Sequence, residues 1–165
     1  QGTRLILDVL TQQELVKMHG TGRSQLYSLN GASPLAHAIG DLFLWEQQRW
    51  DELLATIREL LAKRGRHVLS AWLYGSVARG EDTAYSDVDI ALLVSDQSAA
   101  EVVREEFAEL AAAKQLRISV AALTPIELAA VLPVDHWWAG VQQDGKVLKG
   151  VAPQVAKRQA ERTPT

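Results

Sequence analysis

Two aspartates, Asp87 and Asp89, stand at the start of a strongly apolar stretch that follows a glycine–serine pair. Side chains alternate between the two faces of a β-strand, so a strand here places both carboxylates on one face. Neighbouring carboxylates repel each other unless a cation lies between them, and Mg²⁺ prefers such oxygen ligands together with substrate phosphates. The pair therefore predicts a site for Mg²⁺ or Mn²⁺, with Asp87 and Asp89 as metal ligands and catalytic residues.

The turn formed by Gly75 and Ser76 is the second half of the predicted site. Glycine lets the backbone approach a phosphate closely, and the free N–H groups of a short helical turn beginning at Ser76 favour an anion. Arg79 can donate a fork of hydrogen bonds to a phosphate, or else pair with Glu81 or an aspartate. The loop is expected to hold phosphates while the aspartates hold a metal, which is the arrangement for in-line displacement at phosphorus.

The motif GSVARG at 75–80, followed by SDVD at 86–89, resembles the signature of the nucleotidyltransferase superfamily with the polymerase-β-type fold. The minimal nucleotidyltransferases and their repressor-fused relatives are the most similar group, and the resemblance covers residues 68–150. It implies that the two aspartates bind magnesium and that the glycine–serine turn contacts an NTP such as ATP. It also implies an α/β (α+β) fold, a mixed sheet flanked by helices.

One feature of that family is missing. The family usually has a third carboxylate on a later strand, but residues 117–121 read RISVA, and the position of the acid falls near Ser119. Serine is a poor base and a weak magnesium ligand, and Arg117 nearby opposes a second cation. Three alternatives stay open: the substrate or a partner supplies the base, Glu81 or Asp82 moves in, or the site binds a nucleotide without turning it over.

The pattern of apolar residues predicts the elements that position this site. Residues 35–62 have helical spacing, as one helix or as two with a break between Gly40 and Trp45; Ser33 caps the start and Gly65 is a plausible stop. The other expected elements are a helix at 3–16, a hairpin with Gly20 and Gly22 at its tip, strands at 67–76, 87–94 and 117–123, and helices at 99–114, 124–132 and 136–143. The segment from 149 onward is polar and is expected to be a frayed helix or a disordered tail.

The first thirty residues resemble the last part of a winged helix-turn-helix module, because a helix is followed by a hairpin. DNA contact would come from the polar and basic side chains of this piece, namely Arg4, Thr11, Gln12, Lys17 and Arg23. The alternative is an ordinary solvated hairpin. The helices that precede a recognition helix are not in this chain, which begins with Gln1, so we expect residues upstream of it.

The bulk composition excludes some classes of protein. The chain has 165 residues, 47% of them apolar, which suffices for a real core, and it has no cysteine, so disulfides and thiolate metal sites are excluded. The net charge of −3 gives no global sign of nucleic-acid binding, and no apolar run approaches the ~20 residues of a membrane span. We therefore expect a cytoplasmic protein whose five tryptophans lie mostly in a core or an interface. The expected division is a partial winged helix (1–32), a linker helix (33–66), a nucleotidyltransferase domain (67–150) and a tail (151–165).

These observations favour a magnesium-dependent nucleotidyltransferase that moves NMP from an NTP to an unknown acceptor. A first alternative is a DNA-binding regulator whose transferase-like domain senses a nucleotide, which the missing third acid favours. A second is an antitoxin of a toxin–antitoxin pair that modifies or masks a partner protein. The long helix from Leu35 is expected either to form a homodimer interface or to pack on its own transferase domain.

Overall fold

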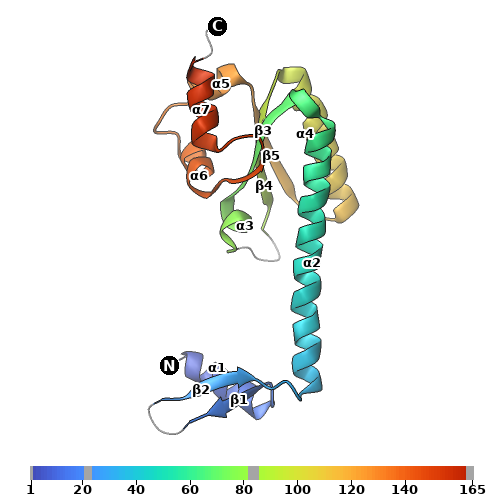
Figure 1. Ribbon diagram of the computed structural model, residues 1–165, viewed down its shortest axis with the longest axis vertical. Coiled ribbons are helices and arrows are strands. Elements are labelled where there is room, and N and C mark those ends of the chain that lie inside the picture. The colour runs from blue at the N-terminus through green and yellow to red at the C-terminus, as the bar shows by residue number, and fades with distance from the viewer. Residues whose placement is uncertain (1, 21–23, 82–85, 163–165) are drawn as a thin grey trace. The chain divides into compact units, whose positions relative to one another are not determined.

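The computed structural model describes residues 2–20, 24–81 and 86–162, and the chain divides into two compact units, Gln1–Ala55 and Thr56–Thr165. Figure 1 shows the elements along the chain. They are α1 (Gly2–Gln12), β1 (Val16–His19), β2 (Leu26–Leu29), α2 (Pro34–Lys63), the 3₁₀ helix η1 (Gly65–His67), β3 (Val68–Tyr74), α3 (Gly75–Arg79), β4 (Val88–Val94), α4 (Gln97–Lys114), β5 (Ile118–Leu123), α5 (Pro125–Ala130), α6 (His136–Asp144), β6 (Lys146–Lys149) and α7 (Pro153–Arg162).

The first unit begins with α1 and an antiparallel hairpin. Strands β1 and β2 pair from Val16 opposite Leu29 to His19 opposite Leu26, as the sequence predicts. Gly20, which leaves β1, has φ +90°, a conformation that glycine adopts without strain. The predicted tip residue Gly22 lies outside the described residues.

Helix α2 is continuous, so of the two alternatives, one helix or two with a break between Gly40 and Trp45, the single helix is confirmed. Pro34 is its first residue, and the Ser33 hydroxyl accepts a hydrogen bond from the Ala36 amide at 3.5 Å, as expected of an N-cap. The helix ends at Lys63, and Gly65 follows with φ +47°. Its last two turns, from Thr56 onward, belong to the second unit.

The second unit is built on a four-stranded mixed sheet in the order β5-β4-β3-β6. Strand β3 is antiparallel to both β4 and β6, whereas β4 and β5 are parallel. In Figure 1, α5, α6 and α7 lie on one side of this sheet, and α4 with the last turns of α2 lies on the other. The predicted α+β fold, a mixed sheet flanked by helices, is confirmed.

The buried core of the second unit holds the strands that carry the site. Trp72 of β3 is 1% exposed and packs edge-to-face on Trp138 of α6, with ring centroids 5.8 Å apart. Of the other tryptophans, Trp50 and Trp137 are half-buried, but Trp45 is 68% exposed, so it lies outside any core of the described chain.

The segment after Lys149, expected as a frayed helix or a disordered tail, instead contains the packed helix α7. Its Ala156 and Ala160 are buried against the face of the sheet that carries Trp72. The Lys157 ammonium donates to the carbonyl oxygens of Leu128, Ala129 and Val131 at 2.7–2.9 Å. It thereby provides hydrogen-bond donors for the carbonyl groups at the C-terminal end of α5.

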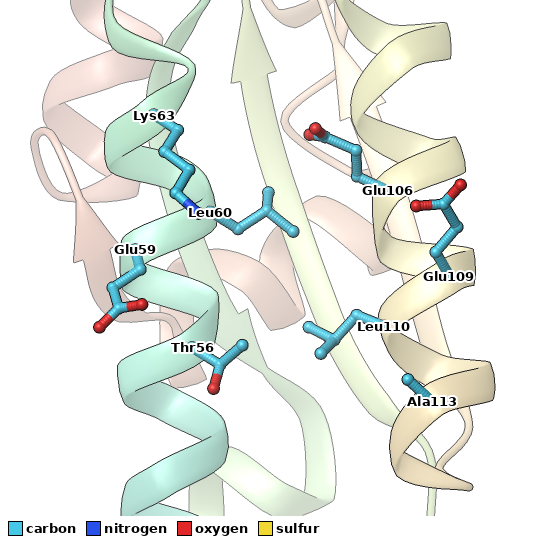
Figure 2. Close-up of a pocket in the computed structure, with 8 residues that line it drawn as sticks. All are labelled: Thr56, Glu59, Leu60, Lys63, Glu106, Glu109, Leu110 and Ala113. Atoms are coloured by element: carbon cyan, nitrogen blue, oxygen red, sulfur yellow. The ribbon is translucent and has the colours of Figure 1, made fainter.

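Within the described residues, none of the helices combines the length and the apolar character that a membrane crossing requires. A groove of about 340 Å³ lies between α4 and the last turns of α2, where Leu60 and Leu110 point toward each other (Figure 2). Its lining residues are Thr56, Glu59, Leu60, Lys63, Glu106, Glu109, Leu110 and Ala113. None of them belongs to the site predicted from the sequence.

Candidate functional site

The two predicted metal ligands lie where β4 begins. Val88 and Ile90 are buried, at 2% and 0% exposure, while Asp87 is exposed and Asp89 between them is half-buried. Asp89 pairs with Tyr74 on antiparallel β3 and with Ser119 on parallel β5. The carboxylate of Asp89 therefore sits in the middle of three strands, at the end of the sheet where β3 enters its turn.

Gly75 brings the predicted phosphate loop against this carboxylate. Its φ is +76°, and a Cβ at this position would lie 2.6 Å from Oδ2 of Asp89. Only a glycine lets the backbone and the carboxylate approach so closely without strain. Ser76 follows in the first turn of α3, and its carbonyl oxygen accepts a hydrogen bond from the Glu81 amide at 3.0 Å. The structure thus brings together Gly75, Ser76 and Asp89.

Arg79 is engaged by carboxylates of the protein itself. Its Nε donates to Oε2 of Glu81 at 2.7 Å, and its Nη1 donates to Oδ2 of Asp144 at 2.5 Å. Of the two alternatives for this residue, pairing with an acid describes the structure. Asp144 lies 65 residues away in sequence and its side chain is 11% exposed. Sequence reasoning missed this partner, and no local pattern identifies it.

Burial and charge both act on Asp89. Burial raises the pKa of its carboxyl group above the ordinary value, the negative charge of Asp87 raises it further, and a hydrogen bond from the Ser119 side chain opposes the rise. Asp87 has a counterion of its own, because Nε of Arg117 lies 2.8 Å from its Oδ1. The site is therefore an anionic pair with one guanidinium and one hydroxyl on its β5 side.

The donor set fits one divalent cation held by two carboxylates. Carboxylate oxygens are what Mg²⁺ and Mn²⁺ prefer, and two carboxylates with one guanidinium beside them leave a net negative charge of one. Among the residues that the structure describes, no group of three or more histidine, cysteine, aspartate or glutamate side chains is placed to hold a metal. Substrate phosphates would have to complete the shell of such an ion.

Tyr74 and Trp137 flank the site, and sequence reasoning did not single them out. The Tyr74 hydroxyl accepts a hydrogen bond from Nε1 of Trp137 at 2.9 Å, and the two rings meet edge-to-face with centroids 6.1 Å apart. Burial and the charge of Asp89 raise the pKa of Tyr74, whereas the bond from Trp137 lowers it, so the phenol stays neutral at pH 7. The available signal was the position of Tyr74, directly before the glycine–serine pair.

The residues predicted to contact DNA lie in the first unit. Arg4, Gln12 and Lys17 are exposed there. The Thr11 hydroxyl donates to the carbonyl oxygen of Leu7 at 2.8 Å, so its proton is used within α1. Arg23 lies outside the described residues.

The segment of the chain that contains the site is similar to a known protein family. Residues 55–130 match the family model described as "Polymerase beta, Nucleotidyltransferase". The chain is similar to this family over that segment. It contains β3, α3, β4, α4 and β5, and with them the glycine–serine turn, both aspartates, and Arg117 with Ser119.

Solved structures of toxin–antitoxin complexes also resemble the chain. A complex with AMP-PNP has a chain that is 22% identical, with a TM-score of 0.47, covering 66% of this chain and 83% of that one. A chain of the MntA–HepT complex is 20% identical, with a TM-score of 0.44 and coverages of 67% and 83%. A chain of the tri-AMPylated Shewanella oneidensis HEPN toxin complex with MNT antitoxin is 21% identical, with a TM-score of 0.43 and coverages of 67% and 82%. No curated protein matches the sequence.

Proposed function

We propose that this protein is a nucleotidyltransferase that moves NMP from an NTP to an acceptor hydroxyl with the help of Mg²⁺ or Mn²⁺. The observation that carries the proposal is the contact between Gly75 and Asp89, with Asp87 beside them. A backbone turn open to phosphates and a pair of carboxylates suited to a divalent ion are what nucleotidyl transfer needs in one place. The similarity of residues 55–130 to the nucleotidyltransferase family supports the same reading.

Each residue of the site would have its own role in the transfer. Asp87 and Asp89 would hold the cation, which when bound neutralises charge on the phosphates. Gly75 and Ser76 lie where the polyphosphate would be held, and Arg79, tied to Glu81 and Asp144, keeps α3 in position. The acceptor oxygen forms a bond to the α-phosphorus, the bond from that phosphorus to the pyrophosphate oxygen breaks, and the acceptor proton passes to a base that the substrate or a partner supplies.

The proposal is tested by label transfer. The chain is incubated with each α-³²P-labelled NTP and Mg²⁺ or Mn²⁺, alone and with extract as a source of acceptors, and NTP binding is measured in parallel. We expect wild type to transfer label, Asp89→Asn to lose at least ~100-fold of the rate because an essential charge is gone, and the exposed-site control Asp8→Asn to match wild type. Equal transfer by Asp89→Asn, or no NTP binding by wild type, would refute the proposal.

A second candidate is a regulator whose transferase-like domain binds a nucleotide without turnover. The observation that favours it is Ser119, whose side chain donates to Asp89 from the strand where a third carboxylate was expected. NTP binding without label transfer, together with a gel shift of DNA that Lys17→Gln weakens, would select this function. The antitoxin alternative predicts instead that the chain co-purifies with the product of a neighbouring reading frame and modifies or masks it.

A homodimer through α2 is proposed on its exposed apolar side chains. Leu42, Phe43, Leu44 and Trp45 are 57–70% exposed, which is unusual for four consecutive large apolar residues. In an antiparallel pair of helices centred on Trp45, Asp41 of one copy faces Arg49 of the other, so the charges are self-complementary. Sedimentation should give a dimer for wild type and a monomer for Trp45→Glu; a wild-type monomer at all concentrations would refute this.

A further inference from the structure

Strand β5 and the residue that precedes it, Arg117, present two hydrogen-bond donors to the two carboxylates of the site. Nε of Arg117 lies 2.8 Å from Oδ1 of Asp87, and the Ser119 side chain donates to Asp89. The parallel register explains this one-to-one match, because Asp89 stands opposite Ser119 and the Val88 amide donates to the Arg117 carbonyl at 2.8 Å. The β5 side of the site is therefore occupied by donors, one of them cationic.

A guanidinium in this position limits the number of metal ions. A site with two metal ions needs enough carboxylates to hold both of them. In such a site the two ions together balance the negative charge that develops around the phosphorus. Here one divalent cation would cancel the charge of Asp87 and Asp89, and Arg117 would repel a second cation at close range. With one cation bound, the guanidinium would be a positive charge without an anion of its own.

We propose that the site takes a single divalent cation and that Arg117 supplies the second positive charge of the site. To do so, the Arg117 guanidinium gives up its ion pair with Asp87 and binds the polyphosphate of the nucleotide. This inference rests on the proposed function and assigns Arg117 as a substrate-binding residue. The guanidinium has the planar fork of donors that matches phosphate oxygens. Its side chain is 64% exposed and that of Asp87 is 48% exposed, so the pair that holds it contributes little and is readily exchanged.

The first arm of the test measures Mn²⁺ alone, by the loss of the free-ion EPR signal on binding. Wild type should bind one Mn²⁺ per chain. Arg117→Gln should bind it more tightly, by about 3-fold, because the removal of an exposed ion pair frees Asp87 for the metal. Arg58→Gln is the matched control, since it removes the same charge from an exposed position on α2 and should leave Mn²⁺ affinity unchanged.

The second arm measures the affinity for ATP and for inorganic tripolyphosphate, each in the presence of Mn²⁺. Arg117→Gln should weaken both by about 10-fold, the value of a lost charge-assisted hydrogen bond. Arg117→Lys keeps the charge but not the fork, and should recover part of the loss. Tripolyphosphate shows that the contact is to phosphate rather than to the base. A merely structural role of Arg117 would not raise the affinity for Mn²⁺ and lower the affinity for polyphosphate in the same variant.

Three outcomes overturn the inference while leaving the proposed function standing. They are two Mn²⁺ per wild-type chain, a loss of Mn²⁺ affinity in Arg117→Gln, and tripolyphosphate binding that is equal in wild type and Arg117→Gln. If wild type binds neither Mn²⁺ nor ATP, both the proposed function and this inference fail. Thermal melting of each variant checks that it folds, which the exposure of Arg117 leads us to expect.

Discussion

The two units of the chain differ in how far their apolar side chains are buried. In the first unit, Ser33, Ala36 and Leu53 are the buried residues among those described, while Leu26 and Phe43 are 72% and 70% exposed. In the second unit many large apolar side chains of the sheet and of its helices form a core, and Trp72, Phe107, Ile57, Ile90 and Leu92 are each less than 2% exposed. The first unit is therefore held together by local structure, and the second by a hydrophobic core.

This difference bears on function. Burial of apolar area is the main source of stability, so the second unit can hold two carboxylates close together and still fold. The first unit instead leaves a run of large apolar side chains exposed on α2, and grouped exposed apolar side chains are typical of interaction sites. We therefore expect chemistry from the second unit and association from the first.

The largest expected contrast is between two tryptophans, one from each unit. Trp72→Ala should reduce the free energy of unfolding by about 3–5 kcal/mol, because a filled core position becomes a cavity and the hydrogen bond from its Nε1 to the Val151 carbonyl is lost. Trp45→Ala should change it by no more than about 0.5 kcal/mol in the monomer, since that ring is exposed. Guanidinium denaturation followed by circular dichroism measures both. Similar losses for the two variants would contradict the division between the units.

Two glycines sharpen the contrast with effects of opposite sign. Gly75→Ala should lower the free energy of unfolding by about 1–2 kcal/mol, because φ is +76° at this position. The new methyl group would lie 2.6 Å from Oδ2 of Asp89 and would therefore push this carboxylate aside. Gly40→Ala should stabilise by about 0.5–1 kcal/mol, because it lies inside α2 with open space around a new Cβ. Mn²⁺ affinity should fall in Gly75→Ala alone. Unchanged stability and unchanged metal binding in Gly75→Ala would be evidence against the close approach at Gly75, and destabilisation by Gly40→Ala would contradict the open space found around Gly40.

Local chemistry made much of the second unit predictable. The capping box of Thr124 and Glu127 follows from a three-residue spacing, and the structure has both of its hydrogen bonds. The burial of Val88 and Ile90 on either side of Asp89 follows from strand alternation. In each case the deciding interactions join residues that are close in sequence.

The features that sequence reasoning missed depend on distant partners. Helix α7 is polar in sequence and is held by small buried alanines and by bonds from Lys157 to α5, which lies 26–29 residues earlier. Strand β6 has four residues and is a strand because β3 pairs with it. The ion pair of Arg79 with Asp144 joins residues 65 positions apart. Periodicity and capping signals carry no information on such contacts.

The smallest expected effect concerns the pH dependence of stability at Asp89. Because the pKa of this carboxyl group is higher in the folded than in the unfolded chain, ionised Asp89 favours unfolding. Its destabilising effect should be full at neutral pH and should vanish as the pH falls below the unfolded value of about 4. Asp89→Asn should therefore melt at a higher temperature than wild type at pH 7, and the gain should disappear near pH 4.

Two comparisons decide whether that gain comes from the site. Asp8→Asn, which removes an exposed carboxylate of the first unit, should stay within about 0.5 kcal/mol of wild type at every pH. Mg²⁺ should raise the melting temperature of wild type but not of Asp89→Asn, since a ligand stabilises only the state that binds it. A pH-independent gain in Asp89→Asn, or equal stabilisation of both proteins by Mg²⁺, would mean that the charge of this carboxylate does not cause the gain. Neither the burial of Asp89 nor its repulsion by Asp87 would then lower the stability of the second unit.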